Sequence, residues 1–184
     1  MAVATDTFPD RTHERRAWIT VAFATMCSAF PAFATGALGV QLRDDLGLSA
    51  TQIGVAMGAS FTVAALLSAP MGRVAQRLGP QWGFRCGLAV SAVAMVSIAV
   101  AGRSFWQFCV LLGIAGAGNA LNQPAANLML ATHVGPTRMG FALAVKQSGM
   151  PAAALLGGGA VPAIALTVGW QWAYAIGAAL AILA

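Results

Sequence analysis

The sequence has few charged residues: Lys, Arg, Asp and Glu make up 8% of its 184 residues, and only five of these are acidic. A soluble domain uses about 25% charged residues to keep its surface hydrated. Here 59% of the residues are hydrophobic, the mean hydropathy is +0.76, and the apolar residues form long runs. This composition excludes an ordinary soluble domain and predicts an all-α integral membrane protein in contact with a lipid bilayer.

Cysteine is also scarce, with Cys27, Cys86 and Cys109 far apart in apolar surroundings. This spacing favours small buried hydrophobes over a disulfide framework or a metal site, and we expect no cofactor. The formal net charge of +5 comes from basic residues scattered between apolar runs. Such residues are typical of topology signals, so we expect no nucleic-acid partner.

The apolar runs predict five complete spans and a shorter sixth, near residues 18–40, 51–71, 82–100, 105–131, 140–166 and 170–184. The sixth has roughly 15 residues where a spanning helix needs about 20. We therefore expect a truncated sixth helix that ends inside the membrane. Residues 1–16 are short and polar, and are expected to form a disordered cytoplasmic tail. The first span is too long for a cleavable signal peptide.

Arginines concentrate on one predicted side of the membrane. Seven fall on the side of the N-terminus and two on the other: Arg11, Arg15, Arg16, Arg73, Arg77, Arg85 and Arg138 against Arg43 and Arg103. Because basic residues favour the cytoplasmic side, this asymmetry predicts a cytoplasmic N-terminus. The expected location is the plasma membrane, as in a bacterial inner membrane.

The fourth span carries four amides at positions i, i+3, i+4 and i+8: Asn119, Asn122, Gln123 and Asn127. At about 100° per residue they occupy an arc of roughly 140° on one helix face. Amides facing lipid are unfavourable, so this face should meet another helix or a cavity. Two interpretations stay open, namely hydrogen bonding between helices and the lining of a solute path.

The fifth span contains Lys146, followed by Gln147. Lys146 lies roughly 9 Å inside the cytoplasmic end of this span, at the depth of Gln123 and Asn127 in an antiparallel neighbour. A lysine in mid-membrane costs about 2.5–3.5 kcal/mol and usually faces a site or a partner. The alternative is that its long side chain reaches back to the interface. Facing inward, it would hold an anionic solute or pair with an acid.

We expect no acid for that pairing within the spans. The five carboxylates are assigned to the tail and the first outer loop: Asp6, Asp10, Glu14, Asp44 and Asp45. A proton relay commonly uses a carboxylate inside the membrane, so the sequence predicts no such relay in this chain.

Proline interrupts the two most polar spans, at Pro124 and Pro151. Membrane helices tolerate such kinks, often near a moving or binding region. Small residues at four-residue spacing predict close helix packing. They are Gly54 and Gly58 in the second span, and Gly149, Ala153 and Gly157 in the fifth.

The segment after the second span, GRVAQRLGPQWGFR, resembles the Gly-x-x-x-Asp-Arg-x-Gly-Arg-Arg signature of major facilitator superfamily (MFS) transporters. Gly72, Arg77 and Gly79 match, Gln76 replaces the aspartate, and the final basic pair is missing. The resemblance implies that this segment is a cytoplasmic gating loop that meets a second half of the transporter.

The fifth span resembles a second family pattern, Gly-x8-Gly-x3-Gly-Pro-x2-Gly-Gly, which is associated with antiporters. Gly140, Gly149, Gly157 and Gly158 match, while alanines replace its central Gly-Pro pair. The runs KQSGMP and LTVGWQWAY look like the cyanate permease-like branch. The resemblance implies the N-terminal half of a protein with twelve spans, in which solute binds between the halves.

Together these features predict a secondary transporter that moves a small solute, favouring an anion, by alternating access. Its missing C-terminal half would come from the same gene or from a separate chain. The alternatives are a fragment that does not transport, a half-transporter awaiting a partner, and a small homo-oligomeric channel. No enzyme is expected: KQSG lacks the first glycine of a Gly-x-Ser-Gly motif, and His133 lies at a span end, where we expect it to be solvated.

Overall fold

A computed structural model describes residues 11–184, and within that range the chain is helical apart from short connections. The elements are α1 (Arg11–Ala37), α2 (Gly39–Leu46), α3 (Ala50–Leu78), α4 (Pro80–Ala101), α5 (Phe105–His133), η1 (Pro136–Arg138), α6 (Met139–Gln147), α7 (Gly149–Ala160), η2 (Val161–Ala165) and α8 (Trp170–Leu183). Helix α1 begins inside the expected tail of residues 1–16, so that expectation is wrong for residues 11–16. Residues 1–10 lie outside the described residues.

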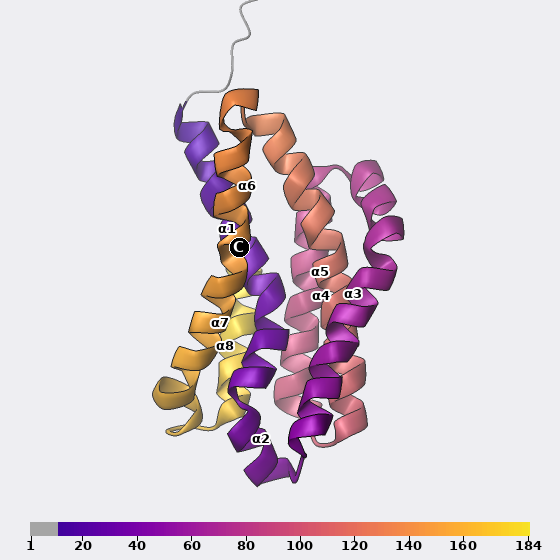
Figure 1. Ribbon diagram of the computed structural model, residues 1–184, viewed down its shortest axis with the longest axis vertical. Helices are drawn as coiled ribbons and strands as arrows, with labels where there is room; N and C mark the ends of the chain where they lie inside the picture. The colour runs from indigo at the N-terminus through magenta and orange to yellow at the C-terminus, as the bar shows by residue number, and fades with distance from the viewer. Residues whose placement is uncertain (1–10) are drawn as a thin grey trace, which may run out of the picture.

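The long helices alternate in direction, and their connections gather at two ends of the bundle (Figure 1). The start of α1, the α3–α4 junction and the α5–α6 junction share one end, which we call the basic end. Helix α2 and the α4–α5 and α7–α8 connections share the other, which we call the α2 end. The predicted grouping of the arginines at two ends of the bundle is confirmed.

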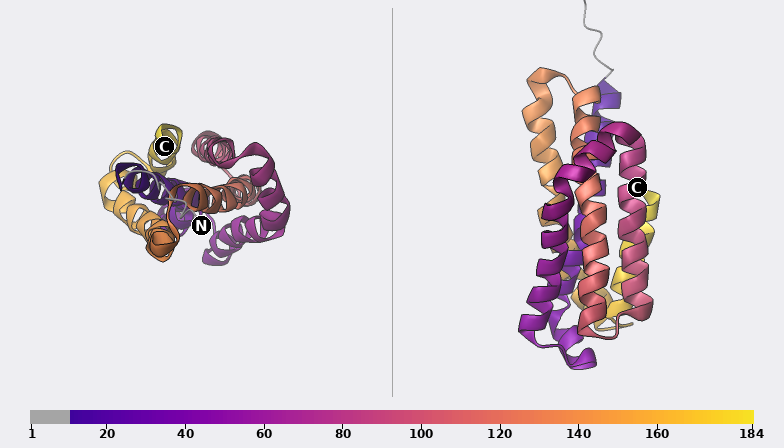
Figure 2. Two further views of the ribbon diagram at one scale, coloured as in Figure 1. Left: turned by 90° about the horizontal axis from the view of Figure 1, so that it is seen from above. Right: turned by 90° about the vertical axis from the view of Figure 1, so that its right-hand side faces the viewer.

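Four helical segments of residues 11–184 are long and apolar enough to cross a membrane. They are Glu14–Ala37, Ala50–Leu78, Pro80–Ala101 and Pro136–Ala165, and Trp170–Leu183 is a shorter apolar helix. Helix α5 has 29 residues, more than the about 20 that a span needs. Its four amides make it the most polar of the long helices near its middle. Viewed from above, α5 lies between α3 and α4 on one side and α1 with α6–α8 on the other (Figure 2).

The second span is longer than expected. Helix α3 continues from Ala50 to Leu78 because little between residues 71 and 78 breaks a helix. The signature residues Gly72, Gln76 and Arg77 therefore lie on its last two turns, which corrects the expectation that they form a loop. Only Gly79 separates α3 from α4, with a φ of 78° that favours glycine. Pro80 then opens α4, where its missing N–H costs no helical hydrogen bond.

The fifth span is divided into three pieces. Pro151 has no N–H to donate to the carbonyl of Gln147 and its ring crowds that carbonyl, so α6 ends at Gln147 and α7 begins at Gly149. Farther on, the helix widens into the π-helical turn η2, where the N–H of Leu166 donates to the carbonyl of Val161 at 3.1 Å. Pro151 thus acts as predicted for a kink. Pro124, by contrast, lies within an unbroken α5.

Small residues bring several helix pairs into backbone contact. A Cβ atom at Gly149 would lie 2.5 Å from the carbonyl oxygen of Ala22, and one at Gly157 would lie 3.3 Å from the Cα of Ala34. With the fully buried Ala153 between them, these glycines place α7 against α1. The predicted packing ladder in the fifth span is confirmed.

Other glycines predicted to pack do not. Gly54 and Gly58 of α3 are exposed, and a Cβ atom at either would meet nothing within 4 Å. The same holds for Gly158 of α7. These positions face away from the bundle because the neighbouring helices lie on the other sides of α3 and α7. The prediction of a packing role is wrong for all three within this chain.

Candidate functional site

The polar site begins where α1 meets α5. The side-chain amide of Asn122 donates to Ser28 Oγ at 2.9 Å and to the Ala24 carbonyl at 3.3 Å, and Asn122 is fully buried. Ser28 Oγ also donates to Asn119 Oδ1 at 3.2 Å. Asn122 therefore joins the two helices and does not reach an open surface.

The other three amides form a ridge along α5. Asn119 and Gln123 are half-buried, and Gln123 Nε2 donates to Asn119 Oδ1 at 3.4 Å. Asn127, one turn farther toward the basic end, is exposed. The predicted single polar face thus divides: Asn122 points to α1, while the ridge of Asn119, Gln123 and Asn127 borders accessible space.

Lys146 of α6 meets this ridge. Its Nζ donates to Asn127 Oδ1 at 2.8 Å, and the lysine is 5% exposed. The predicted meeting of ammonium and amide is confirmed. The low exposure argues against the alternative in which the side chain reaches back to the interface. Gln147 follows about 100° around the helix and is exposed.

The carboxylate nearest to the basic end has another partner. Glu14 lies within α1 and is buried, so its assignment to a solvated tail is wrong. Its side chain accepts from Arg138 Nη1 at 2.9 Å and from the backbone N–H of Gly135 at 3.4 Å. This ion pair ties the start of α1 to the connection between α5 and α6. Among the side chains that the structure describes, no carboxylate pairs with Lys146.

A second polar feature lies at the basic end, between α1 and α5. Arg16, Thr20 and His133 border a shallow pocket of about 190 Å³. The ring Nδ1 of His133 lies 3.0 Å from the carbonyl of Met129, and the side chain is half-buried. The expected position of His133 at a helix end is confirmed, with the ring packed against its own helix.

Sequence reasoning missed Ser28 and this pocket. A single serine in an apolar helix commonly bonds its own backbone, and Ser28 Oγ does lie 3.1 Å from the Thr25 carbonyl. Only the approach of α5, about 90 residues later in the chain, gives it amide partners. No local pattern signals such a pairing.

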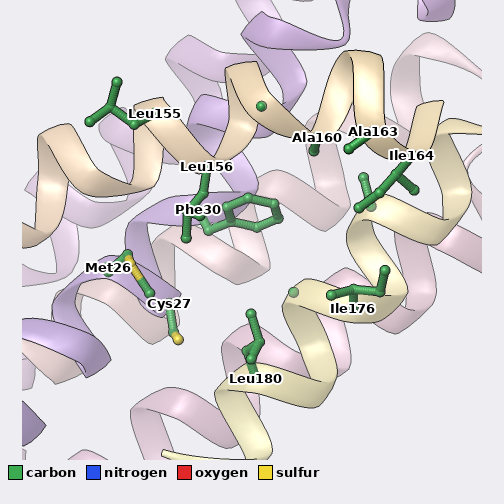
Figure 3. A pocket seen from close by; sticks show the side chains of 13 residues that line it. Met26, Cys27, Phe30, Leu155, Leu156, Ala160, Ala163, Ile164, Ile176 and Leu180 are labelled. Carbon is green, nitrogen blue, oxygen red and sulfur yellow. The ribbon is translucent and has the colours of Figure 1, made fainter. Parts of the chain in front are cut away.

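A third feature is an apolar cavity of about 360 Å³ between α1, α7, η2 and α8. In Figure 3, Phe30 of α1, Leu156 of α7 and Leu180 of α8 surround the same space. The cavity was not predicted, because it arises where small residues on three helices face one another. Within residues 11–184, no group of three or more His, Cys, Asp or Glu side chains could hold a metal ion.

Helices of this length and apolarity, closed around a buried ammonium and its amides, define a multi-pass membrane protein with a polar interior. The sequence model of the Major Facilitator Superfamily matches residues 21–184, and the chain belongs to this family. It is also similar to an MFS-type efflux pump of Mycolicibacterium smegmatis, with 30% identity over 188 aligned positions. That alignment covers 98% of this chain and 43% of the relative, so the chain spans less than half of the relative's length.

Proposed function

We propose that this chain is the N-terminal half of a secondary transporter that moves a small solute by alternating access. Its six spans would be α1, α3, α4, α5, the segment from α6 to η2, and α8. Family membership and the share of the relative that the chain covers support this assignment. In such transporters solute binds near mid-membrane between two halves that rock against each other. The second half would lie against the face of this one that carries the ridge of Asn119, Gln123 and Asn127.

We further propose that Lys146, with the ridge of Asn119, Gln123 and Asn127, lines the solute path and favours an anion. Gln147 borders the same path, and Asn122 holds α1 and α5 in place behind it. The observation that carries this proposal is the buried Lys146 ammonium, whose partner is a neutral amide. A buried cation without a carboxylate favours an anionic ligand, since charges taken out of water need compensation. The runs KQSGMP and LTVGWQWAY lead us to propose the cyanate permease-like branch.

The proposed orientation places the basic end in the cytoplasm and the protein in the plasma membrane, which is the inner membrane in a bacterium. At that end Gly72, Gln76, Arg77 and Gly79, on the last turns of α3 and its junction with α4, would form part of the gate toward the second half. The name of the M. smegmatis relative supports export as the direction.

The first experiment reads the gene beyond the codon for Ala184. An open frame of comparable length would supply the second half on the same polypeptide. A stop codon would call for co-expression with a candidate partner half. Transport of radiolabelled small anions into inside-out vesicles that contain the complete transporter would then test the activity. Uptake equal to that of vesicles without the protein would contradict the proposal.

The variant that tests the path is Lys146→Met. Hydrogen bonds to charged groups contribute about 1.5–3 kcal/mol, so we expect anion transport to fall by roughly 10- to 100-fold. Lys146→Arg keeps the charge and should retain more activity. Ser148→Ala is the matched control, because Ser148 is exposed and its hydroxyl donates to the carbonyl of Val145 in the preceding turn, so it should alter transport less than threefold. Unchanged kinetics in Lys146→Met at equal protein levels would rule out the role of Lys146.

A further inference from the structure

The apolar cavity between α1, α7, η2 and α8 has walls without polar side chains. Thirteen residues line it, all of them Gly, Ala, Leu, Ile, Met, Phe or Cys. Small residues on facing helices create the space, including Gly159 and Ala163 on one wall and Ala173 and Gly177 on another. Its volume of about 360 Å³ lies within the range of small-molecule sites, which is about 300–1,000 Å³.

The chemistry of these walls decides between the possible occupants. A water molecule inside a protein needs two to four polar partners, and the wall side chains offer none beyond the weak donor of Cys27. A polar solute would likewise find no group to orient it. An empty cavity would lose the dispersion contacts of every atom that lines it. The occupant that fits is a hydrocarbon chain.

The cavity opens toward the lipid-facing surface of the bundle. Five of its lining residues are exposed: the small Gly159 and Ala163, and the large Leu155 by 78%, Leu156 by 45% and Ile176 by 43%. Large exposed apolar side chains on membrane-spanning helices contact lipid, so the bilayer surrounds this opening. Lipid chains therefore reach the cavity directly.

The distance of the cavity from the α2 end is within the length of the acyl chains in one leaflet of the bilayer. Helix α8 starts at the α2 end with Trp170, whose Nε1 donates to Asp45 Oδ2 at 3.0 Å, and with the exposed Trp172. Tryptophans mark the interface with the headgroups. From Trp170 the lining residues Ile176 and Leu180 lie roughly 9 and 15 Å along the helix. One leaflet contributes about half of a 30 Å hydrocarbon core, so its acyl chains span this depth.

We propose that this cavity binds the acyl chain of a bilayer lipid from the leaflet at the α2 end. The chain would lie between α7 and α8 against Phe30 and Cys27 of α1. The π-helical turn η2 forms part of the wall through Ala163 and Ile164, and π-helical turns often occur at functional sites. This inference is independent of the proposed solute path, which uses the ridge on α5.

The test compares two adjacent glycines of α7, of which one lines the cavity and the other does not. Gly159 lines the cavity and Gly158 does not, although a Cβ atom at either would meet nothing within 4 Å. The protein is reconstituted in nanodiscs of phosphatidylcholine that carries a diazirine near the end of one acyl chain. After irradiation, mass spectrometry locates the lipid adducts. We expect adducts to concentrate on cavity residues, and Gly159→Leu to reduce them at least fivefold while Gly158→Leu leaves them unchanged.

Equal labelling of the cavity in the unmodified protein and in Gly159→Leu would overturn the proposal, as would adducts spread evenly over the lipid-facing surface. A disulfide between two copies of the chain, formed on oxidation in liposomes through a cysteine introduced by Leu155→Cys, would assign the space to a second copy instead. Ala163→Leu fills the same cavity from η2 and is the second variant if Gly159→Leu lowers the melting temperature in nanodiscs. Loss of adducts in that variant supports the proposal, and their persistence overturns it.

Discussion

Asn122 and Asn127 are the same residue type on the same helix, yet their neighbours give them different roles. Asn122 is fully buried and its amide hydrogen bonds reach α1, whereas Asn127 is exposed and accepts from Lys146. An amide that bonds a serine and a backbone carbonyl between helices stabilises their packing. An amide that holds a buried ammonium at an accessible surface can exchange that partner for a ligand.

At the residue scale, the burial of Asn122 between two helices predicts that its substitution lowers the free energy of unfolding more than substitution of an amide on the ridge does. Asn122→Ala removes two interhelical hydrogen bonds, which average about 0.6 and reach about 1.7 kcal/mol each in membrane proteins. We expect it to lower the free energy of unfolding by about 1–2 kcal/mol, measured by titration with SDS and circular dichroism. Gln123→Ala is the control, because Gln123 is half-buried and bonds Asn119 on its own helix, and it should change that free energy by less than about 0.5 kcal/mol. Equal effects of the two substitutions would contradict the assignment.

Glu14 shows how a single contact revises an interpretation based on position. Its place near the N-terminus suggested a solvated tail, but the bonds from Arg138 and Gly135 bury it at the end of α1. Arg138 remains 43% exposed, so solvent screens the pair and its net contribution to stability is small. The consequence is geometric, because the pair fixes the start of α1 beside the α5–α6 connection.

At the scale of elements, α5 depends on glycines to sit between its neighbours. A Cβ atom at Gly116 would overlap the carbonyl of Ser60 on α3, and one at Gly118 would lie 2.7 Å from the carbonyl oxygen of Gly87 on α4. Both obstacles are backbone atoms, which move only if a whole helix moves. The position of the polar ridge therefore depends on small residues on the other faces of the same helix.

This arrangement predicts that a glycine-to-alanine substitution lowers the free energy of unfolding at Gly116 of α5 but not at Gly54 of α3. Gly116→Ala should force α3 away from α5 and lower the free energy of unfolding by about 1–3 kcal/mol. Gly54→Ala adds a methyl group in open space on α3. It should be neutral or stabilise by up to about 1 kcal/mol, because alanine favours helix more than glycine does. SDS titration of the isolated chain measures both, and a destabilised Gly54→Ala would show that this face packs within the chain.

At the scale of the whole molecule, the two ends of the bundle differ in charge. Seven arginines of the sequence belong to the basic end and two to the α2 end. The helices pass alternately between these ends (Figure 1), so a single orientation in the membrane accounts for all the connections at once.

This asymmetry predicts which connections an impermeant reagent reaches. In a variant with Cys27, Cys86 and Cys109 replaced by alanine, single cysteines are introduced by Gln81→Cys and Ser104→Cys, both at exposed positions. Spheroplasts treated with an impermeant maleimide should label the Ser104→Cys variant and leave the Gln81→Cys variant unlabelled until the membrane is opened. The reverse pattern would place the N-terminus outside the cytoplasm.

Much of the fold could be predicted because it depends on local properties of the chain. Long apolar runs indicate helices in a bilayer wherever they occur, and Pro151 breaks its helix through its own ring and missing N–H. Boundaries were less accurate where no residue stops a helix. Helix α3 continues through the signature residues to Leu78, and α1 begins at Arg11.

The site could be predicted only in part. The meeting of Lys146 and Asn127 followed from equal depth on neighbouring antiparallel spans, and the structure places them 2.8 Å apart. The role of each amide could not follow from its spacing, because spacing fixes the angle around the helix and not which side faces a partner. The ion pair of Glu14 also stayed hidden, since Arg138 is 124 residues away in the chain.

The sequence by itself determined that this protein is a helical membrane protein, because composition and hydropathy are sums over neighbouring residues. It also determined that most of the arginines lie at one end of the bundle and that α5 carries four amides. The tertiary structure alone decided which amide is buried between helices, which glycines meet another backbone, and where an apolar cavity remains among α1, α7 and α8. Those outcomes depend on contacts between residues far apart in the chain, which form only when the helices pack.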